Sequence, residues 1–142
     1  MMTSLTDCCM IDLPKIPDAR GNLTFIEGLR HIPFEIQRAF WIYDVPGGEC
    51  RGGHSYYQTQ ELIVALSGSF CVMLDDGQEK KRMLLNRSYF GLYIPRLIWR
   101  HLEDFSTNAV CLILASTQFS EEDYIRDYGC FLDVRHDTPE LG

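Results

Sequence analysis

The sequence has no apolar run that approaches the ~20 residues a helix needs to cross a bilayer. Its N-terminal stretch, MMTSLTDCCMIDLPK, also lacks the basic start and the long apolar centre of a secretory signal. These two absences predict a cytoplasmic protein that does not interact with membranes.

Basic residues are scarce relative to acidic ones: 13 Lys and Arg stand against 20 Asp and Glu, for a formal net charge of −7 at pH 7. A net anion is repelled by nucleic-acid phosphates and by anionic lipid surfaces, so we expect neither as the main partner. An anion can still bind where arginines gather in one pocket. The positions of Arg20, Arg38, Arg51 and Arg100 therefore matter more than the total charge.

The cysteines include no C-x-x-C pair, the spacing found in many zinc sites and redox motifs. Cys71 and Cys111 lie inside apolar runs, where a free thiol behaves as a small hydrophobic side chain. Disulfides are also rare in the cytosol. We therefore expect every cysteine to be reduced and structural: Cys8, Cys9, Cys50, Cys71, Cys111 and Cys130.

What the chain does have is the length and apolar content of one domain. With 142 residues, of which 46% are hydrophobic, it can bury roughly two-thirds of its unfolded surface but cannot form two ordinary domains. We predict a single domain over residues 1–142, with its core over about residues 10–132. The polar stretch 133–142, DVRHDTPELG, contains Pro and Gly and is expected to form a loose tail.

Turn-forming residues recur about every 8–12 positions, between segments rich in Val, Ile, Phe, Tyr and Trp, which is typical of a β-sandwich or barrel. The pattern predicts strands over residues 22–27, 38–45, 52–57, 61–66, 69–74, 79–85, 91–94, 98–103 and 109–116. Asp75-Asp76-Gly77 supplies residues that tolerate positive φ in a tight hairpin. Near the end, Ser120 followed by Glu121, Glu122 and Asp123 resembles a helix N-cap and predicts one short helix over residues 121–128.

The stretch GECRGGHSYYQTQELIVALSG contains a spaced set of residues: Gly48, His54, Glu61 and Gly68. Their spacing resembles the cupin motif G-x5-H-x-H-x3,4-E-x6-G, with Tyr56 in the place of the second histidine. On a strand, residues 54 and 56 point to one face, and Glu61 can reach the same interior from across a turn. The spacing therefore predicts that the three side chains share one cavity.

Two of the four ligands expected of a metal-binding cupin are replaced. Tyr56 stands for one histidine, and Arg100 ends the segment PRLIWR, where a second motif normally brings another. A guanidinium repels a divalent cation, and one His with one Glu is fewer than the three protein ligands of an open zinc site. We expect a site with neither metal nor cofactor. His101 cannot restore the metal site, since on a strand it points opposite to Arg100.

The remaining set is an imidazole, a phenol, a carboxylate and a guanidinium, which suits proton transfer and the binding of an oxyanion. Together with this set, five sequence blocks resemble the dTDP-4-keto-6-deoxy-glucose 3,4-ketoisomerases, a WxcM-like group of cupins. The blocks lie within residues 18–128: DARGNLTFIEG, IPFEIQRAFWIYDVPGGECRGGH, ELIVALSGSFCVMLDDG, GLYIPRLIWR and FSTNAVCLILASTQFSEEDYIRDY.

The resemblance implies an all-β cupin barrel, also called a double-stranded β-helix or jelly roll, with one short C-terminal helix. It implies an isomerase that moves the keto group between C4 and C3 of a dTDP-linked 4-keto-6-deoxyhexose, for 3-amino-3,6-dideoxyhexose synthesis, and a homodimer without metal. In the family both motif histidines are taken as catalytic, and they map to His54 and Tyr56. An alternative is a cupin that binds the nucleotide sugar but has lost turnover with the second histidine.

Within this hypothesis each residue has a candidate role. His54 is the natural base for the C3 proton, because its ordinary pKa near 6.5 leaves a neutral imidazole at neutral pH. Tyr56, a poor base, is expected to be a donor or relay to a sugar oxygen, or else an aromatic wall residue. Glu61 is expected to orient His54 or Arg100, or to pair with an arginine.

The arginines are candidates for charge stabilisation. Arg100 is expected to stabilise an enediolate or contact a phosphate, and Arg20, Arg38 and Arg51 to bind the diphosphate, which arginine can grip with two N–H groups. An ordinary solvated arginine is the competing interpretation for each of them.

Overall fold

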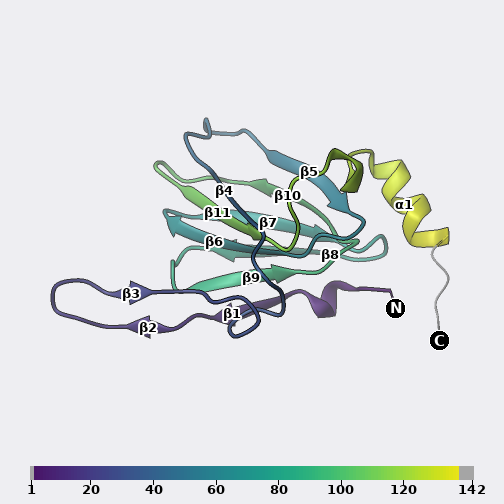
Figure 1. Ribbon diagram of the computed structural model, residues 1–142. Coiled ribbons are helices and arrows are strands. Elements are labelled where there is room, and N and C mark those ends of the chain that lie inside the picture. The colour runs from purple at the N-terminus through teal and green to yellow at the C-terminus, as the bar shows by residue number, and fades with distance from the viewer. Residues whose placement is uncertain (1, 138–142) are drawn as a thin grey trace.

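The computed structural model describes residues 2–137, and its regular elements are almost all strands (Figure 1). The strands are β1 (Cys9–Asp12), β2 (Lys15–Ile16), β3 (Leu23–Thr24), β4 (Arg38–Ile42), β5 (Arg51–Tyr56), β6 (Glu61–Ser67), β7 (Phe70–Asp75), β8 (Lys80–Leu85), β9 (Phe90–Ile94), β10 (Trp99–Glu103), β11 (Val110–Ala115) and β12 (Tyr124–Ile125). Two short 3-10 turns, η1 (Leu5–Asp7) and η2 (Glu121–Asp123), and one helix, α1 (Tyr128–Asp137), complete the list.

The strands form two facing antiparallel sheets in a jelly-roll arrangement. One sheet, called here the outer-face sheet, has the order β1-β9-β6-β11-β4, and the other has the order β12-β5-β10-β7-β8. Strands β2 and β3 form a separate ribbon that projects from the body at one end (Figure 1). The fold is therefore the predicted all-β cupin type, with one helix near the C-terminus.

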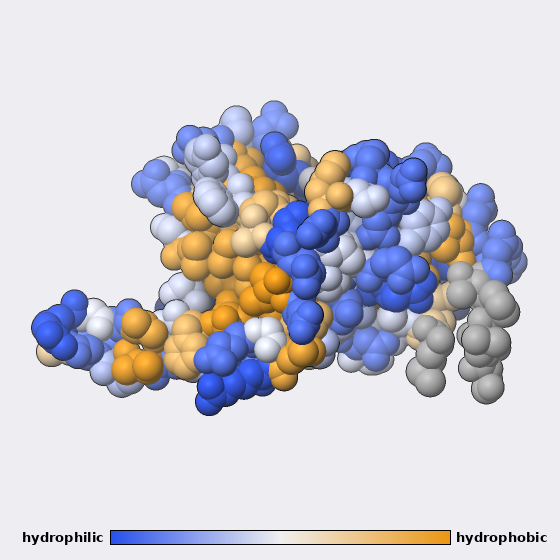
Figure 2. Space-filling view, viewed as in Figure 1, coloured by the Kyte–Doolittle hydropathy of each residue, from blue (hydrophilic) through white to orange (hydrophobic). Residues whose placement is uncertain are grey.

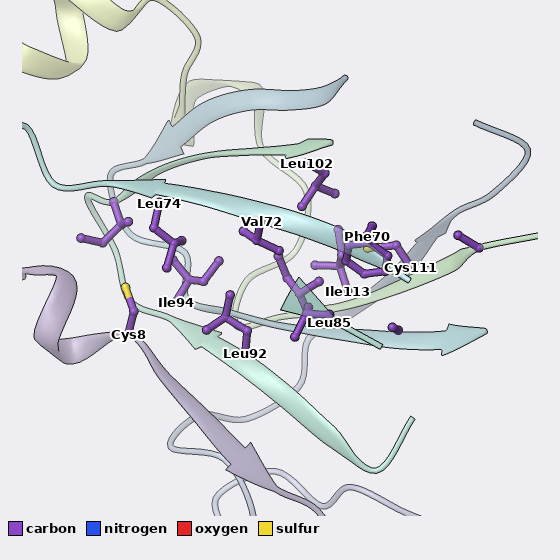
Figure 3. Close-up of a cluster of buried hydrophobic side chains, with 14 of the residues drawn as sticks. Cys8, Phe70, Val72, Leu74, Leu85, Leu92, Ile94, Leu102, Cys111 and Ile113 are labelled. Carbon is purple, nitrogen blue, oxygen red and sulfur yellow. The ribbon is translucent and has the colours of Figure 1, made fainter. Parts of the chain in front are cut away.

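Alternation along the strands separates two apolar clusters. On β6, Ile63 and Ala65 face the main core between the sheets, whereas Leu62 and Val64 belong to a second cluster on the other face. Figure 3 shows the main core, in which side chains of β9 and β11 meet side chains of β7 and β10. This closed core supports the cavity described below.

Each predicted strand overlaps an observed one, although only Leu23–Thr24 of residues 22–27 is strand. The hairpin at Asp75-Asp76-Gly77 is confirmed: β7 and β8 are paired, Gly77 has φ of 93°, and its N–H donates to Asp75 at 2.7 Å. Strands β1, β2 and β12 were not predicted. The pair β2–β3 and strand β12 have only two residues each, too few to show alternation.

The helix prediction over residues 121–128 is wrong. Ser120 makes no side-chain capping bond, and only Glu121–Asp123 turns, as a 3-10 helix. The Asp123 carboxylate instead accepts backbone N–H bonds from Gln58 at 2.7 Å and Thr59 at 3.1 Å, which ties the segment to the β5–β6 turn. The next residues extend alongside β5 as β12.

The helix begins after Asp127, whose carboxylate accepts the N–H of Cys130 at 2.9 Å. It runs to Asp137 and buries Phe131 against Leu97 and Ile125. The predicted loose tail is therefore wrong for residues 133–137, and residues 138–142 lie outside the described part. The predicted core limit is also too late at the N-terminus, because Leu5 and Cys8 join the main core.

All six cysteines are free, and Cys71 and Cys111 are buried, as predicted. Over residues 2–137, no helix is long and apolar enough to cross a membrane.

Candidate functional site

A cavity of about 310 Å³ opens between the two sheets and is lined by both apolar and polar side chains. Its apolar lining includes Phe40, Ile42, Ile63, Leu102 and Ile113. Its polar lining includes Arg51, His54, Tyr56, Glu61, Arg100, Tyr124 and Arg126. The predicted cavity of residues 54, 56, 61 and 100 is therefore present.

A larger hollow of about 770 Å³ lies between the N-terminal residues and α1, but it is a weaker candidate for an active site. Its guanidinium, Arg135, is bonded to the Leu97 carbonyl at 3.0 Å and to Thr3 at 3.3 Å. The smaller cavity brings an imidazole, two phenols and several cations together, so it is the candidate active site.

Strand pairing explains why these side chains meet. His54 and Tyr56 are two residues apart on β5 and face the same side, whereas Ser55 between them points away. On β10, Arg100 is the register partner of His54. His101, the next residue, lines a different hollow on the far face of the sheet, as predicted.

The floor of the cavity contains a buried ion pair. Arg100 and Glu61 are each 2% exposed, and Nη1 of Arg100 bonds Oε1 of Glu61. Two further N–H groups of Arg100 donate to the Ile98 carbonyl, from Nε at 3.1 Å and from Nη2 at 2.9 Å. Burial raises the pKa of Glu61, while the Arg100 guanidinium opposes that rise.

Tyr56 completes this network from the other side. Its hydroxyl donates to Oε2 of Glu61 at 3.1 Å, and its ring lies 5.1 Å from the Arg100 guanidinium carbon. Burial, and then the Glu61 charge, raises the pKa of Tyr56, so the phenol stays protonated. Both carboxylate oxygens of Glu61 are thus occupied, by a guanidinium and a phenol.

This geometry does not suit a metal ion. Arg100 fills a ligand position with a positive charge and already neutralises Glu61. Among the described residues, no group of three or more His, Cys, Asp or Glu side chains is arranged to hold an ion. That the protein works without a metal stays a prediction.

His54 differs from its neighbours because its buried Nε2 has no hydrogen-bond partner among the described residues. Its ring lies 4.9 Å from that of Tyr56 and 5.2 Å from that of Tyr124, measured between centroids. Burial lowers the pKa of His54 to about 3, with further lowering by the charges of Arg100, Arg126 and Arg38. The imidazole is therefore neutral at neutral pH, and His54 is one of the residues that line the cavity.

The structure treats the three predicted diphosphate arginines differently. Arg51 is exposed and lines the cavity. Arg38 is half-buried beside the rings of Phe40 and Phe119, at 5.3 and 5.7 Å, and its buried Nε has no partner. Arg20 lies in the β2–β3 ribbon, where its side chain is 90% exposed and paired with Asp18. It therefore lies outside the cavity of its own chain.

Two cavity residues were missed from the sequence: Tyr124 and Arg126. Tyr124 pairs with Tyr56 across β12 and β5, with ring centroids 4.7 Å apart. Arg126 lies over the Tyr124 ring at 4.1 Å and is paired with Glu121. The alternation of positions 124 and 126 was the available signal, but the helix predicted over this segment obscured it.

The family model FdtA, described as WxcM-like, C-terminal, matches residues 6–136. The chain belongs to this family. A curated relative, the TDP-4-oxo-6-deoxy-alpha-D-glucose-3,4-oxoisomerase of Aneurinibacillus thermoaerophilus, is 40% identical over 122 residues, which cover 86% of this chain and 88% of the relative.

Solved structures agree. A mutant of the 3,4-ketoisomerase QdtA from Thermoanaerobacterium thermosaccharolyticum, in complex with TDP-4-keto-6-deoxyglucose, matches with a TM-score of 0.92 and 36% identity over 98% of this chain and 100% of that one. A 3,4-ketoisomerase from Helicobacter canadensis matches with a TM-score of 0.90 and 37% identity over 92% and 98% of the two chains. The resemblance to WxcM-like ketoisomerases is confirmed.

Proposed function

We propose that this WxcM-like chain is an isomerase that moves the keto group between C4 and C3 of a TDP-linked 4-keto-6-deoxyhexose. The observation that carries the proposal is the neutral His54 imidazole, which lines a cavity with phenols and guanidinium groups and whose Nε2 has no hydrogen-bond partner among the described residues. The relatives described above, which act on or bind such sugars, support the choice of substrate.

In this proposal His54 takes the proton from C3. Burial first, and the nearby arginine charges second, lower the pKa of His54 to about 3, which makes the imidazole a weak base. A bound diphosphate would offset the arginine charges and so raise the pKa of His54 in part, which strengthens it as a general base. Substrate binding would thus prepare the base for its task.

Tyr56, Glu61 and Arg100 act together behind His54. Arg100 would stabilise the negative charge of an enediolate, because a guanidinium carries a permanent positive charge and donates hydrogen bonds to anions. Of the two roles expected for Tyr56, the relay fits better than the direct donor, since its hydroxyl proton is already bonded to Glu61. Glu61 holds both partners and has no free oxygen for the sugar.

Arginines at the cavity mouth would bind the diphosphate. Arg51 and Arg126 line the cavity and are exposed enough to meet a ligand. Arg38 does not line the cavity, but its charge reaches His54, so it would act on a bound diphosphate from farther away. For Arg20 the same role requires that the β2–β3 ribbon of one chain reach the cavity of another.

We further propose that the protein is a cytoplasmic homodimer. The outer-face sheet exposes Trp41 (59%), Tyr43 (60%) and Leu66 (49%), and the ribbon exposes Ile16 (52%) and Leu23 (54%). Figure 2 shows an apolar area on the sheet face and further apolar residues on the ribbon. Exposed apolar patches of this kind mark protein interfaces, and a second copy is their most common partner. Light scattering at micromolar concentration should give twice the mass of one chain, and the monomer mass would contradict the dimer.

The decisive experiment incubates the protein with TDP-4-keto-6-deoxyglucose in deuterated water and follows the sugar by NMR. We expect a 3-keto product and deuterium on the carbon that receives the proton. Tight binding of the nucleotide sugar with neither product nor exchange would instead indicate the binding protein that has lost turnover.

A further inference from the structure

The Tyr56 hydroxyl is committed to another group. It donates to Glu61 at 3.1 Å, and Glu61 is in turn paired with Arg100. Tyr56 itself is fully buried, with 0% exposure. A phenol has only one proton to donate. In this arrangement Tyr56 therefore cannot donate to a sugar oxygen while it keeps its bond to Glu61.

A second phenol lies beside Tyr56 and lines the same cavity. Tyr124 is half-buried and lines the cavity, with its ring 4.7 Å from that of Tyr56 and 5.2 Å from the His54 imidazole. The pairing of β12 with β5 sets Tyr124 opposite Tyr56. The side chain of Tyr124 also adds to the rise in the pKa of Tyr56, which indicates that the two phenols interact.

The isomerisation needs two separate proton transfers. One proton leaves C3 and one arrives at C4, and a second proton leaves O3 and one arrives at O4. His54 can serve the carbon atoms, because a neutral imidazole accepts a proton and returns it. The neighbouring guanidinium groups cannot serve the oxygens, since arginine does not give up its proton in proteins.

We propose that Tyr124 is a further catalytic residue, whose hydroxyl transfers a proton from O3 to O4 while His54 transfers one from C3 to C4. The inference rests on the proposed isomerase function. Because O3 and O4 are on adjacent carbons, a single hydroxyl placed between them can donate to one and accept from the other.

The steps balance without an oxidant or reductant. The C3–H bond breaks, its proton goes to Nε2 of His54, and its electron pair forms the C3–C4 double bond. The π pair of the C4 carbonyl takes the Tyr124 proton at O4, which gives an enediol. The O3 proton then passes to the Tyr124 oxygen, the C3 carbonyl forms, and the double-bond pair takes the proton from His54 at C4. Both residues return to their starting states.

The surroundings of Tyr124 fit this task. Arg126 lies over its ring at 4.1 Å, and a nearby cation lowers the cost of a partial negative charge on the phenol during transfer. The Tyr56 ring packs against the Tyr124 ring and is itself held by Glu61, so Tyr56 fixes the position of the catalytic phenol from behind.

The test uses Tyr124→Phe, with Tyr128→Phe as the matched control. Tyr128 bonds Asp75 at 2.6 Å and lines a hollow on the other face of the sheet. We measure kcat and KM for TDP-4-keto-6-deoxyglucose, and in deuterated water the ratio of deuterium exchange at C3 to product formed. Thermal melting verifies that each variant is folded.

For Tyr124→Phe we expect kcat to fall about 10²-fold, the usual scale for a lost acid–base group, with KM within about threefold. The exchange-to-product ratio should rise. When the proton cannot be transferred from O3 to O4, the intermediate is reprotonated at C3 more often than at C4. A kcat within about threefold of the parent, or equal losses of exchange and turnover, would overturn the role of Tyr124 alone. A parent without turnover would overturn the isomerase function and this inference with it.

Discussion

Two arginine–glutamate pairs serve the same cavity and behave differently. Arg100 and Glu61 at the floor are each 2% exposed, whereas Arg126 and Glu121 at the mouth are 54% and 61% exposed. A buried pair becomes costly when one partner is removed, because the other charge then stays unpaired away from water. An exposed pair contributes little and can exchange partners. The floor is therefore a fixed framework, and the mouth can release a cation to a ligand.

His54 lies between these two regions, and its loss should have the largest effect on activity. We expect His54→Asn to lower kcat by about 10³- to 10⁴-fold, since it removes the carbon base. Affinity for TDP should stay within about threefold, because the mouth arginines remain. Steady-state kinetics with calorimetric TDP titration measures both. Parent-like turnover of this variant would reduce His54 to a structural residue.

Removal of the floor carboxylate tests the comparison directly. Glu61→Gln should lower the free energy of unfolding by about 3–5 kcal/mol, because it leaves the Arg100 charge buried and unpaired. Glu121→Gln at the mouth should cost no more than about 1 kcal/mol. Denaturant titrations of both variants give the two values. Similar losses would mean that the two pairs do not differ as proposed.

The depressed pKa of His54 should make stability depend on pH. The folded pKa is about 3, against 6.5 for the ordinary imidazole, so between these values the unfolded chain binds more protons. This contribution is complete above pH 6.5 and is lost as the pH falls toward 3. From pH 6.5 to 4.5 the parent should lose about 2–3 kcal/mol of stability that His54→Asn does not lose. Parallel pH profiles of parent and variant would contradict the shift.

Tyr56 belongs to the floor of the cavity. Its substitution should slow turnover less than the loss of the base His54. We expect Tyr56→Phe to slow turnover by about 10²-fold, since the ring stays but the bond to Glu61 is lost. Tyr57→Phe is the control, because Tyr57 packs with the cluster of Leu97, Ile125 and Phe131. If an active parent is indifferent to Tyr56→Phe, the tyrosine is only wall packing.

At the mouth the expected effects are smallest. Arg126→Gln should weaken TDP binding about tenfold, the scale of one lost charge-assisted hydrogen bond, and should leave kcat within a few-fold. Arg30→Gln is the control, since Arg30 forms an exposed pair with Glu27 away from the cavity. Calorimetry at two salt concentrations measures the change. A loss of kcat as large as that of Tyr56→Phe would mean that the Arg126 charge beside Tyr124 matters more for the proton transfer than for binding.

Prediction from the sequence succeeded where the information is local and repeated. Strand alternation placed His54 and Tyr56 on one face, and the motif spacing brought Glu61 to the same cavity. It failed over residues 121–128, where an acidic turn after Ser120 resembles a helix start. The Asp123 carboxylate binds the backbone of the β5–β6 turn instead, a contact with residues far away in the sequence. Tyr124 and Arg126 were missed for that reason.

By itself the sequence determined the all-β fold, the face on which each motif residue lies, and the replacement of two ligand histidines by a phenol and a guanidinium. Only the tertiary structure decided how these groups pair. Glu61 holds Arg100 and Tyr56, the latter opposite Tyr124 across β12, and burial among cations lowers the pKa of His54. The physical reason is that alternation acts between neighbours in the chain, whereas hydrogen-bond partners and desolvation depend on segments that meet only after the sheets close.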